Sequence, residues 1–377
     1  TVLVKDINAG SANSSPAILR AMGGVLYFAA TTAANGGELW KSDGTLAGTV
    51  MVSEIAGGAT SSSPANLTVV GSNLFFSAFT SASGTELWKS DGTAAGTVLV
   101  RDIFAGTSSS SPSNLVHVNG TLFFAATDSA GGIELWKSDG TAGGTVLVKD
   151  ISAGTGSSSP FALVDAYGSL YFRAFTAANG AELWKSDGTA AGTVLAADVF
   201  PGAFSSNLVT PVVLDSNLFF SATGQDLGSE LWMYDLGVPE IAVKQPLAVN
   251  LTDGVSTVSY GSVDVGSSQT RTFTITNTAL SASLSGLSVA VTGANPGDFV
   301  PVPVSLSPLA AGGSVTVDVT FSPLAAGARN AVLQITSSGM AMVRAATLGK
   351  ISRRPSGTPM VDNASISSVT RITPSCA

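Results

Sequence analysis

Five tryptophans recur along this sequence at a constant interval of 48 residues, and each follows a Glu-Leu pair. They are Trp40, Trp88, Trp136, Trp184 and Trp232. An aromatic pair and an aliphatic position keep the same interval, so no repeat carries an insertion. A repeat without insertions indicates one supersecondary structure copied along the chain.

Each repeat predicts four short strands. In the second repeat we expect them at 66–70, 74–78, 86–90 and 98–103. The segment between the last two strands is rich in Asp, Gly and Thr, which favour tight turns. No segment of ten or more residues is both free of Gly and patterned with the 3.6-residue period of a helix, so we expect almost no helix.

Four antiparallel strands repeated in this way predict a β-propeller, and an open solenoid is the alternative. Residues 1–7 resemble the fourth strand of a repeat, whereas the last repeat lacks its fourth strand. Pairing these two ends would complete a fifth blade and remove two open sheet edges. We therefore predict an all-β chain in which residues 1–236 form a five-bladed β-propeller closed by the N-terminal strand. A fragment of a longer array is the remaining interpretation.

The repeated octapeptide is Glu-Leu-Trp-Lys-Ser-Asp-Gly-Thr, with copies at Glu38–Thr45, Glu86–Thr93, Glu134–Thr141 and Glu182–Thr189. The fifth copy, which starts at Glu230, loses the Gly-Thr turn. The motif resembles that of the bacterial ELWxxDGT repeat family. The resemblance implies a secreted or surface protein and brings no known activity.

The 48-residue register stops at Gly237, and residues 237–348 alternate with a period of two, as in an immunoglobulin-like β-sandwich. The stretches 261–266, 271–277, 297–299 and 319–323 resemble the choice-of-anchor D domain, an immunoglobulin-like relative of the ASH domains. This resemblance implies an extracellular spacer or contact module without catalytic residues.

Residues 349–377 are predicted to be a linker and tail in which 364–373 is a candidate docking strand. The repeat region is acidic and the tail is basic. We expect the tail to dock on an acidic surface or to add a strand to a neighbouring sheet edge. A solvated terminus is the alternative.

Composition excludes several classes of site and partner. The single histidine, His117, and the single cysteine, Cys376, rule out a two-His metal site, a Cys-based zinc site and an internal disulfide framework. The net charge of −8 argues against a nucleic-acid partner. No apolar run is long enough to cross a membrane. No export signal opens the chain. Because the resemblance to the ELWxxDGT family implies a secreted or surface protein, we expect an extracellular or cell-surface location and a mature chain without its export signal.

Fifteen of the 25 acidic residues occupy three repeated positions, which distributes them evenly instead of pairing two unlike carboxylates as a glycosidase requires. We therefore predict no catalytic residue and no cofactor, with Ca²⁺ bound at the turn aspartates as an alternative. The five tryptophans are expected to pack between blades, and a sugar-stacking platform is the other interpretation.

The first strand of each repeat varies most. His117 and Asp165 occupy equivalent positions in adjacent repeats, and Arg20 lies in the neighbouring column. These three are the candidate binding residues, because such positions line or flank the channel of a propeller. An Asp beside a His is more often a satisfied polar pair than a catalytic one.

These features together predict a non-enzymatic extracellular scaffold, adhesin or surface-assembly subunit of a filament or coat. Its partners would be other proteins or further copies, reached through the basic tail. A multivalent carbohydrate-binding propeller is the alternative, and a propeller glycoside hydrolase is a third possibility.

Overall fold

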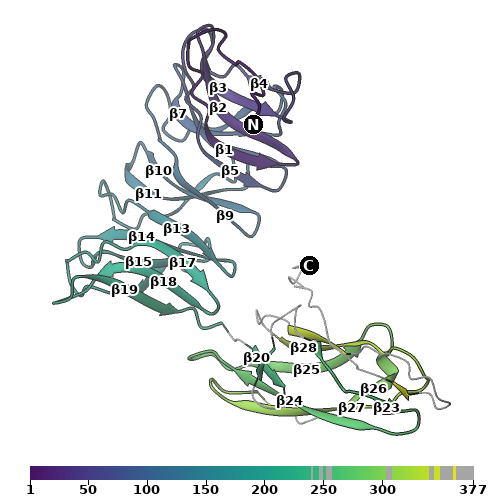
Figure 1. The fold of residues 1–377 in the computed structure, drawn as a ribbon. Helices are drawn as coiled ribbons and strands as arrows, with labels where there is room; N and C mark the ends of the chain where they lie inside the picture. The colour runs from purple at the N-terminus through teal and green to yellow at the C-terminus, as the bar shows by residue number, and fades with distance from the viewer. Residues whose placement is uncertain are drawn as a thin grey trace. The chain divides into compact units, whose positions relative to one another are not determined.

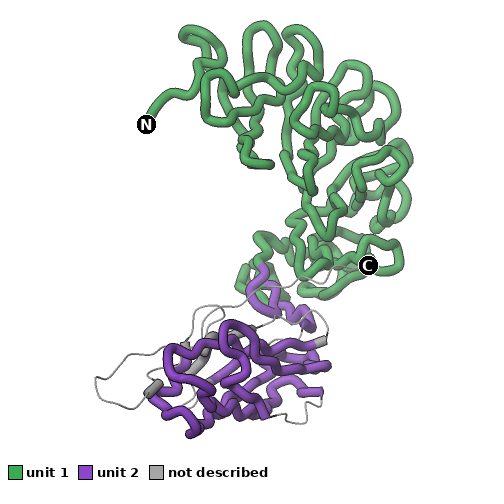
Figure 2. Tube along the Cα trace, turned by 90° about the vertical axis from the view of Figure 1, so that its right-hand side faces the viewer, with its two compact units in different colours: residues 1–212, 219–233 green, residues 213–218, 234–377 purple. Residues whose placement is uncertain are grey.

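The computed structural model describes residues 1–238, 241–245, 249–251, 257–302, 308–338, 344–348 and 360–361. Within them the chain is all-β, and a short 3-10 turn at Pro296–Asp298 is the one helical element. The chain divides into two compact units, residues 1–212 with 219–233 and residues 213–218 with 234–377 (Figure 2). The domain boundaries at 236 and 348 stay predictions.

The repeats form small antiparallel sheets, each in the order of the sequence (Figure 1). The first sheet contains β1 (Ala17–Met22), β2 (Val25–Thr32), β3 (Gly36–Ser42) and β4 (Val50–Ser53). The second contains β5 (Ala65–Val70), β6 (Asn73–Thr80), β7 (Gly84–Ser90) and β8 (Val98–Arg101). The third contains β9 (Ser113–Val118), β10 (Thr121–Asp128), β11 (Gly131–Ser138) and β12 (Val146–Lys149). The fourth contains β13 (Phe161–Ala166), β14 (Ser169–Thr176), β15 (Gly180–Ser186) and β16 (Val194–Ala197).

The fifth sheet has three strands, β17 (Val209–Leu214), β18 (Asn217–Thr223) and β19 (Ser229–Asp235). In the complete sheets the third and fourth strands pair in one register, with Trp136 opposite Leu147 and Lys137 opposite Val146 in the third sheet. Among the described residues, β19 has no strand in the place that β12 occupies beside β11.

The turn between the third and fourth strands follows from its sequence. Asp91 Oδ1 accepts hydrogen bonds from the backbone N–H and the hydroxyl of Thr93, at 2.8 and 2.7 Å. Gly92 between them has a φ of +92°, which glycine adopts without strain. The repeated Asp-Gly-Thr sequence therefore builds the same turn in each of the four complete sheets.

Successive sheets stack face to face, and each junction repeats the same hydrophobic contacts. Phe75 and Leu87 of the second sheet pack with Leu122 and Phe124 of the third. Phe123 and Leu135 of the third sheet pack in the same way with the fourth. Each sheet thus contacts its neighbours in sequence, which is how a repeat array buries its core.

The predicted closure of the ring is not found. Residues 1–6 form no strand, and the first sheet and β19 lie at opposite ends of the first compact unit (Figure 1). The physical reason is that closure requires the rotations between successive sheets to sum to a full turn, and packing at each single junction does not fix that sum. The structure supports an all-β row of small antiparallel sheets without a closed ring among the described residues. An open solenoid was the alternative interpretation of the sequence.

The second compact unit contains a β-sandwich. One sheet runs in the order β21 (Val249–Asn250), β20 (Ile241–Gln245), β24 (Gln269–Asn277), β27 (Ser314–Phe321) and β26 (Phe299–Pro301). The other runs in the order β22 (Thr257–Val258), β29 (Arg344–Leu348), β28 (Ala331–Ser338) and β25 (Ser285–Thr292). Residues that alternate with a period of two in the sequence therefore form strands of two sheets here.

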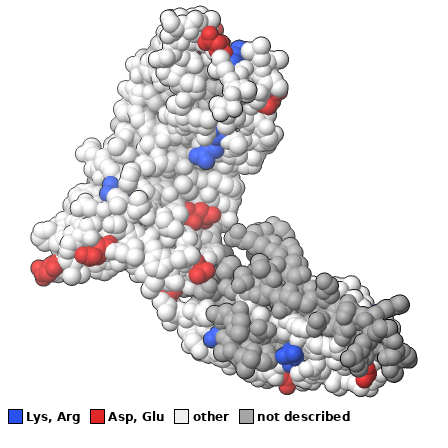
Figure 3. Space-filling view, viewed as in Figure 1, with Lys and Arg blue, Asp and Glu red and all other residues white. Residues whose placement is uncertain are grey.

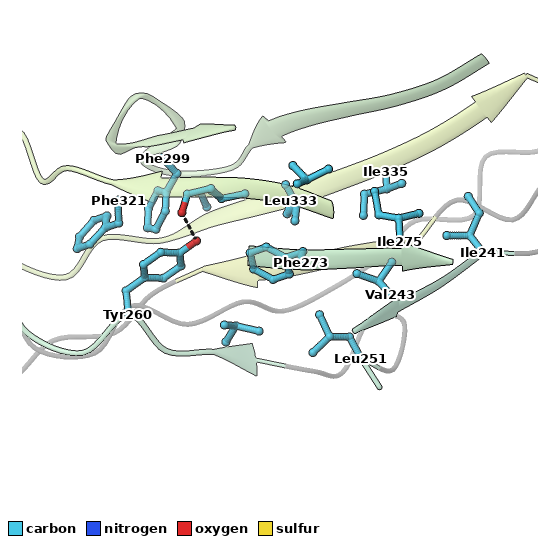
Figure 4. Packing of buried hydrophobic residues seen from close by; sticks show 14 of the residues in the cluster. Ile241, Val243, Leu251, Tyr260, Phe273, Ile275, Phe299, Phe321, Leu333 and Ile335 are labelled. Atoms are coloured by element: carbon cyan, nitrogen blue, oxygen red, sulfur yellow. Dashed lines mark hydrogen bonds between the residues drawn. The ribbon is translucent and has the colours of Figure 1, made fainter. Parts of the chain in front are cut away.

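The core of the sandwich lies between these sheets and joins Phe273, Ile275, Leu333 and Ile335 (Figure 4). At one end Tyr260 lies against Phe299 and Phe321. Its hydroxyl donates a hydrogen bond of 3.0 Å to the backbone carbonyl of Val319. Burial raises the pKa of the Tyr260 phenol, so the hydroxyl stays protonated and remains a donor.

Most of the predicted tail lies outside the described residues, including the candidate docking strand at 364–373. The described part is β30 (Met360–Val361), which pairs antiparallel with β23 (Val263–Asp264). This pairing joins a short piece of the tail to the second unit of the same chain.

Candidate functional site

In each of the four complete sheets, the glutamate of the Glu-Leu-Trp motif is buried and accepts hydrogen bonds from the following loop. Glu134 accepts hydrogen bonds from the backbone N–H of Ile151 at 2.9 Å, the N–H of Ser158 at 2.8 Å and the hydroxyl of Ser158 at 2.6 Å. Burial raises the pKa of the Glu134 carboxyl, and these hydrogen bonds oppose that rise. The carboxylate holds the loop that leads into the next repeat, so its role is structural.

The other two repeated acids also hold turns. Hydrogen bonds from Thr141 lower the pKa of Asp139 in the Asp-Gly-Thr turn. Asp150, which precedes the aliphatic position, accepts a hydrogen bond of 2.9 Å from the N–H of Gly154. All three repeated acid positions therefore stabilise the backbone of the repeat.

The tryptophans lie in the stacked faces. Trp40, Trp136 and Trp184 are buried, and Trp88 is partly buried against the first junction. Trp232 of the fifth sheet is half-buried, and its indole N–H donates to the carbonyl of Ala222 at 2.9 Å. Their positions are those of packing residues rather than of an exposed aromatic platform.

The structure does not join His117 to Asp165. His117 Nε2 accepts a hydrogen bond of 2.8 Å from the N–H of Gly120, and Asp165 Oδ1 accepts one of 2.8 Å from the N–H of Gly168. Each side chain thus holds the turn that follows its own strand. No hydrogen bond between the two is found in the described part of the chain, and their role in binding stays a prediction.

Arg20 links two repeats rather than presenting a free guanidinium. Its Nε donates a hydrogen bond of 2.9 Å to the carbonyl of Leu67 in the next sheet. Across the described residues, no group of three His, Cys, Asp or Glu side chains could hold a metal ion. Within the same residues, no helix is long and apolar enough to span a membrane.

One end of the repeat array, the edge formed by β19, exposes side chains whose equivalents are buried in the other sheets. Leu231 is 75% exposed, whereas its equivalents Leu39, Leu87, Leu135 and Leu183 are 0% exposed. Glu230 and Met233 are also exposed. Because β19 lacks a fourth strand, the end combines apolar side chains with a backbone edge whose hydrogen-bonding groups have no strand partner among the described residues.

The N-terminal end of the array carries a segment with the sequence of a fourth strand. Residues 1–7 lie against the first sheet, where Lys5 Nζ donates a hydrogen bond of 2.7 Å to the carbonyl of Thr49 and Ile7 packs on the cluster around Trp40. Lys149 makes the same contact with Thr193, also at 2.7 Å. Yet Leu3 is 80% exposed, whereas the equivalent Leu147 is 38% exposed.

On the face that Figure 3 draws, uncharged surface separates the few Lys, Arg, Asp and Glu side chains of the described residues. The edge of β19 offers backbone hydrogen-bonding groups, apolar side chains and the carboxylate of Glu230 to a partner. The sequence revealed that a strand was missing there, but only the structure showed that the chain leaves the position open.

Residues 248–343 match the model of the ASH (Abnormal spindle-like microcephaly-associated, ASPM-SPD-2-Hydin) family. The match covers most of the sandwich and supports the ASH-like part of the sequence interpretation, and it suggests protein–protein interaction. The comparisons do not show the ELWxxDGT family. A comparison with curated proteins found no match.

Two solved structures are similar in part. One is a puromycin hydrolase, with 14% identity and a TM-score of 0.38 over 69% of this chain and 42% of that chain. Another is a Mycobacterium tuberculosis puromycin-hydrolyzing peptidase, with 11% identity and a TM-score of 0.39 over 72% of this chain and 44% of that chain. The chain thus spans less than half the length of these proteins, and at these scores the similarity assigns no activity to it.

The expected function is nevertheless corrected by these comparisons. The sequence predicted a non-enzymatic extracellular scaffold, adhesin or surface-assembly subunit, with a lectin or a glycoside hydrolase as alternatives. The solved structures that match are peptidases and belong to none of these classes. Those predictions are therefore not carried further.

Proposed function

We propose that this chain is a protein-binding module that takes up an extended peptide segment at the open edge of β19. The observation that carries the proposal is the exposure of Leu231, a side chain that is completely buried at the four equivalent positions. Strand addition at a free sheet edge is a common mode of peptide recognition, in which the main chain supplies affinity and alternate side chains supply specificity.

The repeat defines what the bound segment must look like. In the complete sheets the fourth strand is a short apolar segment, such as Val98–Arg101 or Val146–Lys149. Its first residues lie opposite the Lys and Trp of the third strand. A segment that binds β19 therefore needs alternating aliphatic residues and an extended backbone.

The ASH match supports the same class of function from the other compact unit, because it suggests protein–protein interaction. The four octapeptides in residues 1–236 support assignment of the array to ELWxxDGT-type repeats, with the location outside the cell that this resemblance implies. The repeated acids support binding rather than catalysis, because hydrogen bonds to the backbone already occupy them.

The test is a titration of a fluorescein-labelled peptide with the sequence of residues 97–103, followed by fluorescence anisotropy. We expect saturable binding to the full chain. Leu231→Asp places a charge in the apolar contact and should weaken binding at least tenfold. The matched control is Leu324→Asp, since Leu324 in the second unit is 73% exposed and lies away from β19 in sequence.

A peptide with the same composition in scrambled order controls for nonspecific adsorption. The proposal fails if no saturable binding is seen, or if the Leu231→Asp protein binds as well as the unchanged protein. Circular dichroism of both variants establishes that they are folded.

A further inference from the structure

We propose that the segment bound at β19 is Thr1–Ile7 of a second copy of this chain. This inference rests on the function proposed above and names the partner of the same edge. It predicts a head-to-tail contact in which the fifth sheet of one copy gains its fourth strand from the next copy.

The sequence of the segment carries the first step. Thr1–Ile7 is identical, residue for residue, to Thr145–Ile151, the segment that contains β12. Since β12 pairs with β11 in the third sheet, the same residues are already shown to fit beside a Glu-Leu-Trp strand. Transfer of that register places Val2 opposite Met233, Leu3 opposite Trp232 and Lys5 opposite Leu231.

The second step concerns the contacts of the segment with the sheet that follows it. The segment that contains a fourth strand also contacts the following sheet, and Thr1–Ile7 makes the same kind of contact with the first sheet. The Lys5–Thr49 contact reproduces that of Lys149 with Thr193. Further along, Ser14 accepts a hydrogen bond of 2.8 Å from the N–H of Thr31, as Ser158 does from Phe175 at 2.7 Å. On its other side, the segment has no strand partner among the described residues, and β19 has the sequence of such a partner.

Glu230 supplies an independent polar contact. In the third repeat, Glu134 accepts hydrogen bonds from the N–H of Ile151 and from Ser158. The equivalent donors for Glu230 are Ile7 and Ser14, which lie at the far end of the first compact unit. The exposed Glu230 would therefore become buried and satisfied when a second copy docks.

The apolar faces at the two ends of the array are complementary, because they correspond to the two faces that pack together at each internal junction. Leu26 of the first sheet is partly exposed, whereas its equivalents Leu74, Leu122 and Leu170 are completely buried. Leu231 is the residue that would cover this face, as Leu39, Leu87 and Leu135 do at the internal junctions. The contact between copies thus continues a junction that the chain builds repeatedly within itself, and it is heterologous.

A cross-linking experiment tests the register. One protein carries Val2→Cys and the other carries Met233→Cys, both in a Cys376→Ser background. Directly opposed residues in an antiparallel pair lie within reach of a disulfide. We expect the mixture to form a disulfide-linked pair under mild oxidation, whereas Val2→Cys mixed with Leu324→Cys should not.

Sedimentation velocity tests the assembly. The unchanged chain should increase in mass with concentration, and Leu324→Asp should behave in the same way. Leu3→Asp and Leu231→Asp should each remain monomeric. Mixing these two variants leaves one intact donor and one intact acceptor, so they should form a one-to-one complex.

A strictly monomeric chain across the concentration range overturns the inference. A protein carrying both Val2→Cys and Met233→Cys that cross-links only within itself also overturns it, because the segment then closes its own ring. If the labelled peptide binds the Leu3→Asp protein while the unchanged chain stays monomeric, the strand-accepting function stands and the second-copy partner fails. If the peptide does not bind either, both fail.

Discussion

The hydroxyl of Ser110 donates a hydrogen bond of 2.6 Å to the carboxylate of Glu86, and both side chains are buried. The two residues belong to successive repeats, so this contact ties the second sheet to the loop that enters the third. The N–H groups of Ile103 and Ser110 complete the shell around the carboxylate at 2.9 and 2.8 Å. The equivalent Glu230 is exposed and lacks these donors in the described residues.

Removal of the buried carboxylate should therefore destabilise the array. Glu86→Ala leaves buried N–H and hydroxyl donors without an acceptor, which should lower the free energy of unfolding by about 2–4 kcal/mol. Urea denaturation followed by tryptophan fluorescence measures the change. Glu230→Ala is the matched control and should leave the stability of the monomer nearly unchanged. Equal losses for the two variants would contradict the assigned role.

The buried glutamates predict one direction of pH dependence. Burial raises the pKa of Glu134 above its ordinary value of 4.5, so the folded state binds protons more tightly than the unfolded state. The stability from this group is fully present below pH 4.5 and is lost as pH rises through the raised pKa. Glu134→Gln should therefore remove part of the decline in stability between pH 4.5 and neutrality in urea titrations. If the Glu134→Gln protein loses as much stability between pH 4.5 and neutrality as the wild type, Glu134 is not the source of the decline.

The turn aspartates predict the opposite direction. Hydrogen bonds from Thr141 lower the pKa of Asp139 below its ordinary value of 3.8. The stability from this group is present above pH 3.8 and is lost as pH falls through the lowered pKa. Asp139→Asn should flatten the acid limb of the stability profile, measured by thermal unfolding between pH 2 and 5. An unchanged acid limb would contradict the assignment.

Two adjacent glycines in the third turn should respond differently to the same change. A Cβ at Gly144 would lie 2.1 Å from Asp139 Oδ1, whereas a Cβ at Gly143 would meet nothing within 4 Å. Gly144→Ala should lower the stability by about 1–3 kcal/mol, because the turn must distort to admit the methyl group. Gly143→Ala should be neutral or slightly stabilising. Thermal unfolding of both variants decides the matter, and a reversed order would refute the turn geometry.

His117 and Asp165 should act independently of each other. Each accepts a hydrogen bond from the glycine N–H of its own turn. A double-mutant cycle of His117→Ala and Asp165→Ala should give a coupling energy below about 0.5 kcal/mol. A larger coupling would restore the polar pair that the sequence alignment suggested.

The local structure of the repeats was largely predictable. The four strands of the second repeat fall at 65–70, 73–80, 84–90 and 98–101, within a few residues of the positions that alternation and turn chemistry indicated. The buried glutamates were recognised as repeated but not as hydrogen-bond acceptors. That function depends on a loop more than twenty residues away, which spacing alone does not place.

The sequence by itself determined that every repeat forms the same four-stranded sheet, because the residues that make each turn and each stacked face lie within one 48-residue interval. It also determined that the two ends of the array match, since Thr1–Ile7 repeats Thr145–Ile151. Only the tertiary structure decided that these ends do not meet. Closure depends on the rotation between successive sheets summed along the array, and no single residue or junction encodes that sum.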